Sequence, residues 1–206
     1  MIPEVDRALG DLLRSRAPRG GQVEISFEAP TRDWAAGRNV PTVNAYLYDI
    51  TEDSQRRSFG IQPERDESGI VVARRRPLRY FRLSYLLTCW TRRPEDEHRL
   101  LASMLGCLIS TDVLPVPGDG VLASLETPVQ LTVAAPGDDS RSAADLWSAL
   151  GGNLKPSLNV VVIAPYRPEP DDQVAPPVTE ATGVVGRRLD APGEADPVRL
   201  RRVRRI

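Results

Sequence analysis

The side chains that most often do chemistry are sparse in this chain of 206 residues. The only histidine, His98, has Glu95 and Glu97 nearby, and such a group could suggest a metal site. No second histidine and no Cys-x-x-Cys spacing completes it, and a Ser–His–Asp triad would have to use the same histidine. The better interpretation of His98 is a residue on a helix surface.

Signatures of phosphate and nucleotide chemistry are missing as well. No Gly-x-x-x-x-Gly-Lys motif occurs, and the similar segment 183–188 lies in a proline-rich region without a preceding strand. An arginine–aromatic segment at 79–82 could stack single-stranded nucleic acid, but Phe81 belongs to the face that a strand would bury. Carboxylates are plentiful, yet no pair of them is marked out by an apolar setting that would raise a pKa. The sequence therefore predicts no catalytic site, no cofactor and no metal.

The overall charge points to no particular partner. The chain has 27 basic and 28 acidic residues and a formal net charge of −1, so we expect neither a membrane nor a nucleic-acid partner from charge alone. No signal peptide is recognisable, and no apolar run approaches the roughly 18 to 20 residues of a spanning helix. Cys89 and Cys107 could form a disulfide, but two buried thiols in a reduced cytoplasm are the preferred interpretation.

The rest of the chain is organised around a strand predicted at 79–91 and a helix predicted at 94–109. In the strand, one face carries Phe81, Leu83, Tyr85, Leu87 and Cys89, and the period of two predicts that this face is buried. The other face carries Arg82, Ser84 and Thr88 and is expected to be partly wet. In the helix, a stripe at helical spacing is made by Leu101, Met104, Leu105 and Leu108, with Leu100 beside it. Pro94 suits its first position.

Further elements follow from the same periodicities. We predict strands at 23–28, 42–50, 128–134 and 158–164, and helices at 2–15 and 142–150. Together they indicate an α+β domain over residues 1–165. Trp34, Trp90 and Trp147 suit either contacts with a partner or filling of the core.

Two stretches lack the apolar periodicity of a core. Residues 51–77 are mostly polar, with strand character only at 70–72, and are interpreted as a long excursion or arm. Residues 166–206 are an extended proline-rich tail, whose basic end suits a solvated terminus or a segment that orders on a partner. The candidate interface residues in these stretches are arginines: Arg74, Arg75, Arg76, Arg199, Arg201, Arg202, Arg204 and Arg205.

Four ordered blocks resemble one family. They are Val-Glu-Ile-Ser-Phe-Glu-Ala-Pro at 23–30 followed by a tryptophan, Pro-Thr-Val-Asn-Ala-Tyr-Leu-Tyr-Asp-Ile at 41–50, Tyr-Leu-Leu-Thr-Cys-Trp at 85–90 followed by Glu-His-Arg-Leu-Leu at 97–101, and Asp-Leu-Trp-Ser-Ala-Leu at 145–150 with Pro-Ser-Leu-Asn at 156–159. They look like the cap, or tail-terminator, proteins of phage-tail-like contractile injection systems. The motif residues are Pro30, Trp34, Pro41, Asn44, Tyr46, Tyr48, Tyr85, Trp90, His98 and Trp147.

The resemblance implies a structural role without catalytic residues. The expected fold is that of phage tail terminators, a mixed, mainly antiparallel sheet of about five strands packed by two to three helices. Family members are expected to form a homohexameric ring that contacts the inner-tube and sheath proteins, closes the baseplate-distal end of the particle and ends polymerisation. Assembly is expected in the cytoplasm, as part of a contractile particle that either stays there or is released from the cell.

Three other functions stay open at this point. Another sheath adaptor or tail-completion protein of the same machine would share the fold, because fold does not fix function. A nucleic-acid-binding module would use the arginines of the tail and would bind in a strongly salt-dependent way. An enzyme of unrecognised type would need a deep cleft with several inward-pointing carboxylates.

Overall fold

The computed structural model describes residues 1–17, 23–65, 67, 69, 71–118, 120–134 and 143–168. Its strands are β1 (Glu24–Ser26), β2 (Thr42–Glu52), β3 (Gln62–Arg65), β4 (Val71–Arg75), β5 (Arg79–Trp90), β6 (Gln130–Val133) and β7 (Ser157–Tyr166). Its helices are α1 (Ile2–Arg16), α2 (Arg32–Ala36), α3 (Pro94–Ile109), α4 (Val121–Ser124) and α5 (Ala143–Ala149), with a 3₁₀ turn, η1, at Ser54–Arg56. No helix in these ranges is long and apolar enough to cross a membrane.

A five-stranded mixed sheet forms the centre of the molecule, in the order β1-β2-β5-β7-β6. β1 runs parallel to β2, whereas the β2–β5, β5–β7 and β6–β7 pairs are antiparallel. β5 lies in the middle and pairs with β2 on one side and β7 on the other. The predicted α+β class, with a mainly antiparallel sheet, is thereby confirmed.

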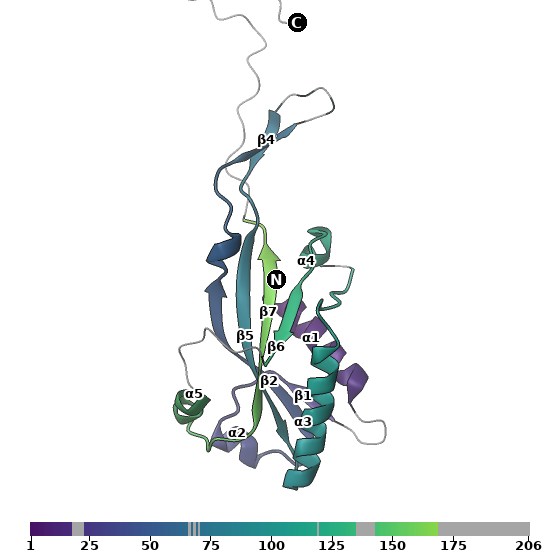
Figure 1. Ribbon diagram of the computed structural model, residues 1–206, viewed down its shortest axis with the longest axis vertical. Coiled ribbons are helices and arrows are strands. Elements are labelled where there is room, and N and C mark those ends of the chain that lie inside the picture. Colours follow the sequence, from purple (N-terminus) through teal and green to yellow (C-terminus); the bar gives the residue numbers. More distant parts are fainter. Residues whose placement is uncertain are drawn as a thin grey trace, which may run out of the picture.

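One face of the sheet is covered by α1 and α3 (Figure 1). On β5, Leu83, Tyr85, Leu87 and Cys89 alternate along this face and are fully buried, as the period of two predicted. The two helices contribute leucines, a valine and a methionine to the same core. Burial of each such side chain stabilises the fold by about 2 kcal/mol, and this is what holds the helices on the sheet.

The buried face of α3 differs from the predicted stripe. Leu100, Met104, Cys107 and Leu108 are buried, whereas Leu101 and Leu105 are only half-buried. The reason is that α3 contacts α1 as well as β5 and β6. The buried side chains are those that face α1, β5 and β6, even where they lie away from the centre of the apolar stripe.

The second face of the sheet was expected to be partly exposed to solvent. At one end of the sheet this expectation was wrong. Ser84, Leu86 and Thr88 on this face of β5 are buried. Trp34 of α2 and Trp147 of α5 contact Trp90, the last residue of the same strand, so both helices cover this end of the sheet. The expectation failed because the sequence pattern gave no sign of α2, which has five residues.

The polar stretch 51–77 is an arm, as predicted. β3 and β4 form a separate antiparallel hairpin that projects beyond the end of the main sheet (Figure 1). Arg74 and Arg75 lie in β4, and Arg76 follows it. The predicted strand at 70–72 corresponds to the start of β4, and its pairing strand β3 was not predicted.

Candidate interaction surfaces

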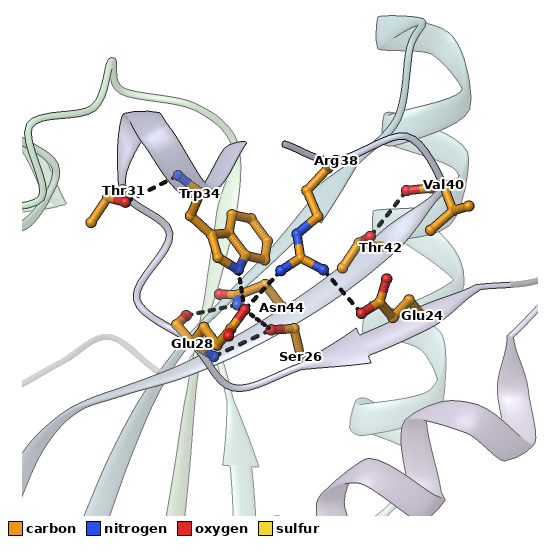
Figure 2. A network of polar contacts seen from close by, with 9 residues as sticks. All are labelled: Glu24, Ser26, Glu28, Thr31, Trp34, Arg38, Val40, Thr42 and Asn44. Carbon is orange, nitrogen blue, oxygen red and sulfur yellow. Dashed lines mark hydrogen bonds and ion pairs between the residues drawn. The ribbon is translucent and has the colours of Figure 1, made fainter. Parts of the chain in front are cut away.

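A polar network fixes the connection between β1 and β2 (Figure 2). The Glu28 carboxylate accepts hydrogen bonds from Trp34 Nε1 at 2.5 Å and Arg38 Nη2 at 2.7 Å. Arg38 Nη1 also pairs with Glu24 Oε1 at 2.9 Å. Asn44 Nδ2, from β2, donates to the Glu28 backbone oxygen at 2.8 Å. These charge-assisted bonds hold the Arg38 guanidinium in one place on the surface.

The same end of the molecule brings the three tryptophans together. The ring centroids of Trp34 and Trp90 lie 5.5 Å apart, and those of Trp90 and Trp147 lie 6.3 Å apart. Arg38 lies 4.3 Å from the Trp34 ring centroid, and Lys155 Nζ lies 3.6 Å from that of Trp90. Trp147 is 1% exposed. Of the two interpretations of the tryptophans, the structure therefore favours filling of the interior.

Lys155 links the aromatic cluster to α3. Its Nζ donates to the Cys89 backbone oxygen at 2.6 Å and pairs with Glu97 Oε2 at 2.8 Å. Burial, together with the nearby Glu97 carboxylate, raises the pKa of the Cys89 thiol to about 12. Burial also raises the pKa of Cys107. Both cysteines are free and buried, so the preferred interpretation of two unpaired thiols is confirmed.

A pocket of about 780 Å³ opens beside this network, between the α2–β2 connection, the end of β5 and the first turns of α3. Its apolar lining comes from Val23, Ala35, Val40, Pro41, Trp90 and Leu100. Its polar lining includes four arginines, Arg38, Arg92, Arg93 and Arg99, and one carboxylate, Asp96. We call it the arginine pocket. Glu24 and Glu28 already neutralise Arg38 and Asp96 pairs with Arg99, so any preference for a negatively charged occupant comes from Arg92 and Arg93.

The arm carries a second surface. Phe59 is 84% exposed and Ile61 is 53% exposed, which is unusual for side chains of this size. The Arg57 guanidinium lies 5.1 Å from the Phe59 ring centroid. At the base of the arm, Arg79 pairs with Glu52 and thereby lowers the pKa of that carboxyl. The base is therefore fixed to the main sheet, while apolar side chains face solvent.

The predicted site residues are spread over several places. Arg74 is exposed on the arm, together with Arg75 and Arg76. Arg199, Arg201, Arg202, Arg204 and Arg205 lie outside the described residues. His98 is exposed on α3, as interpreted from its sequence context.

Most of the motif residues serve the fold. Pro30, Asn44, Tyr85 and Trp147 are buried, and Tyr46 is half-buried. The hydroxyl groups of two tyrosines link elements: Tyr85 to Asp6 of α1 at 2.7 Å, and Tyr48 to Asn159 of β7 at 3.0 Å. Only Pro41 and Trp90 of the motif set line the arginine pocket.

Sequence reasoning missed the pocket arginines. Arg38 lies just before β2, and the other three lie at 92–99. Neither part of the sequence has a binding-site signature. The pair Arg92-Arg93 directly before Pro94 was the one available signal. Pro94 marks the first position of a helix, so the two arginines before it are expected at the N-terminus of that helix.

Comparison with solved structures shows the same fold in two proteins. One is the sheath/tube terminator of PVC, an extracellular contractile injection system, in the extended state, with 24% identity and a TM-score of 0.64 over 93% of this chain. The other is the tube-terminating cap of the anti-feeding prophage, with 21% identity and a TM-score of 0.60 over 87% of this chain. The chain spans 65% and 60% of the length of these two proteins.

Sequence comparison assigns the family. No curated protein matches the sequence significantly. A family model does match, over residues 4–180, which include all the strands and helices of the described structure except the first two residues of α1. The chain therefore belongs to the Pvc16 N-terminal domain family.

Proposed function

We propose that this chain is the terminator domain of a contractile injection particle, a structural cap that closes the baseplate-distal end of the inner tube and sheath. The observation that carries the proposal is the combination of family membership over residues 4–180 with a fold shared by a sheath/tube terminator and a tube-terminating cap. The role is structural rather than catalytic, like that of a sheath/tube terminator or a tube-terminating cap. Assembly in the cytoplasm as a particle component fits this role.

In this proposal the caps form a homohexameric ring on the last layers of tube and sheath. A ring requires heterologous contacts that close on themselves. The main sheet suits an end piece, because its edge strands are short: β1 has three residues and β6 has four. Short edges offer little template for another strand, so a bound cap would not present a surface on which polymerisation continues.

The arm and the tail are the proposed contacts with neighbouring subunits. The exposed Phe59 and Ile61 give the arm an apolar surface beside its arginines. Aromatic and arginine side chains are enriched at the centres of protein interfaces. Basic residues of the tail would add electrostatic attraction to an acidic tube or sheath surface.

The test is electron microscopy of particles from cells with and without the protein, with a label fused to its C-terminus. The cap role predicts a label at the end away from the baseplate, and particles of uncontrolled length or without sheath when the protein is absent. Normal particles without label would refute it. A label at an internal position would instead indicate an adaptor or tail-completion protein.

Deletion of residues 167–206 tests the tail separately. We expect the remaining domain to stay folded but to co-purify less with tube and sheath. A matched full-length variant, with the five arginines at 199–205 changed to glutamine, separates charge from length. Unchanged co-purification and normal particle lengths in both variants would remove the tail from the proposal. Salt-dependent nucleic-acid binding that vanishes in both would favour the nucleic-acid-binding alternative.

A further inference from the structure

The arginines of the arginine pocket are not all held by a close carboxylate. Arg38 is held by Glu24 and Glu28, and Arg99 pairs with Asp96 at 3.0 Å. Arg93 lies 4.0 Å from the exposed Glu95, and Arg92 has no ion pair with another residue in the described ranges. Arg92 is therefore the guanidinium available to an added anion, and Arg93 beside it is held only at 4.0 Å by an exposed carboxylate.

Beneath these arginines the pocket is apolar. Leu100 at its floor is 4% exposed, and Val40 at its edge is 41% exposed. An occupant that suits both parts carries carboxylates for the rim and an aliphatic side chain for the floor. An extended peptide segment with adjacent acidic residues has this chemistry.

The chain itself contains such a segment directly after β7. Residues 169–174 read Glu-Pro-Asp-Asp-Gln-Val, which places three carboxylates within four residues and an aliphatic side chain two residues later. The later acidic residues, at 190–196, run directly into the arginines at 199–205, which the pocket would repel. Charge complementarity therefore selects 169–174.

A chain cannot place this segment in its own pocket. Tyr166 pairs with Arg79 at the first residue of β5, whereas Trp90 at the last residue of β5 lines the pocket. These ends of β5 are about 36 Å apart at roughly 3.3 Å per residue. The six residues from Tyr166 to Asp172 reach at most about 22 Å, so the carboxylates fall short.

We propose that the arginine pocket binds residues 169–174 of a neighbouring copy of the chain. β7, which precedes the segment, ends at one end of the sheet and the pocket lies at the other, so each copy would donate to one neighbour and accept from the next. This head-to-tail contact is of the kind that closes into a ring. The inference deepens the proposed function and rests on it for the adjacency of copies.

Binding is measured by fluorescence anisotropy, with a labelled peptide of residues 167–176 and the full-length protein. The Arg92→Ala/Arg93→Ala double variant is expected to weaken binding about two- to thirtyfold, because it removes two exposed ion pairs. A peptide with Glu169→Gln, Asp171→Asn and Asp172→Asn should lose affinity similarly. The control is Arg7→Ala, an exposed arginine on α1, which should leave the affinity unchanged.

Cross-linking between full-length copies tests the arrangement directly. In the test pair, one copy carries Asn39→Cys at the pocket and the other copy carries Val174→Cys. In the control pair, the first copy instead carries Ser110→Cys, at the far end of α3. The pocket pair should form the intermolecular disulfide at least about tenfold faster, and Arg92→Glu in the pocket copy should abolish the difference.

The outcomes separate this inference from the cap role. Equal cross-linking rates, or equal affinities for the acidic and amide peptides, would overturn the inference even if rings and capped particles form normally. Tighter binding of a single-stranded oligonucleotide that displaces the peptide would also overturn it. A third outcome combines two results: the purified copies cross-link specifically, and cells without the protein still make normal particles. This outcome would refute the cap role and leave the inference standing.

Discussion

The hydrogen bond between Tyr85 and Asp6 offers a sharp test of how α1 is held on the sheet. Tyr85 is fully buried, and its hydroxyl donates to Asp6 Oδ1 at 2.7 Å. Burial raises the pKa of Asp6, and the bond from Tyr85 acts in the opposite direction. Tyr85→Phe removes only the hydroxyl and leaves a partly buried carboxylate without this donor. We expect the free energy of unfolding to fall by about 2 kcal/mol at pH 7.

The loss should depend on pH. Because the pKa of Asp6 is raised above its ordinary value of 3.8, the folded state binds this proton more tightly than the unfolded chain. The contribution of Asp6 to stability therefore falls as the pH rises through its folded pKa. Without the Tyr85 hydroxyl this pKa rises further, so the cost is largest at neutral pH. Near pH 4, with more of Asp6 protonated, the loss should shrink to about 1 kcal/mol.

Urea unfolding at pH 7 and pH 4, followed by tryptophan fluorescence, measures the effect. In an Asp6→Asn background, Tyr85→Phe should cost about 1 kcal/mol or less at both pH values. Equal losses at the two pH values in the Asp6 background, or an unchanged loss after Asp6→Asn, would refute the reasoning. Loss of particle attachment with unchanged stability would show that Tyr85 acts at an interface instead.

Three further predictions concern Trp147, Lys155 and the two cysteines. Trp147→Ala should cost about 3 kcal/mol, whereas Trp147→Phe should cost about 1 kcal/mol, because the buried Nε1 has no hydrogen bond within the described residues; urea unfolding compares the two. Lys155→Met should cost about 2 kcal/mol by leaving Glu97 unpaired, and adding Glu97→Gln should restore part of it. Cys89 and Cys107 should resist a thiol reagent at pH 8 in the native protein and react in urea, because both are buried and their pKa values are raised. Rapid labelling of the native protein would contradict this.

The main elements could be predicted because their periodicity is strong. The strand predicted at 79–91 is Arg79–Trp90, and the helix predicted at 94–109 has the same bounds in the structure. In both, apolar side chains recur at the spacing that one buried face requires. The short α2 and α4 could not be predicted, because one turn of helix leaves no period to detect.

Contacts between distant segments were beyond the sequence pattern. Trp34, Trp90 and Trp147 are spread over more than half of the chain, and only the fold brings them to one end of the sheet. The burial of Thr88 has the same origin, since this polar residue accepts a hydrogen bond from Trp90, which side chains of α2 and α5 contact. Local propensity carries no information about which helix will lie over which face.

Stability and attachment should therefore be separable in this domain. The buried motif residues, such as Asn44 and Tyr85, hold the sheet and its covering helices, so their substitution acts first on folding. The exposed Arg92, Arg93 and Phe59 contribute little to the core, so their substitution should leave the unfolding transition unchanged while altering contacts between subunits. The proposed cap role would need this division, because a cap's surface would have to match a tube, a sheath and a neighbouring copy while one core keeps all three surfaces in a fixed relation.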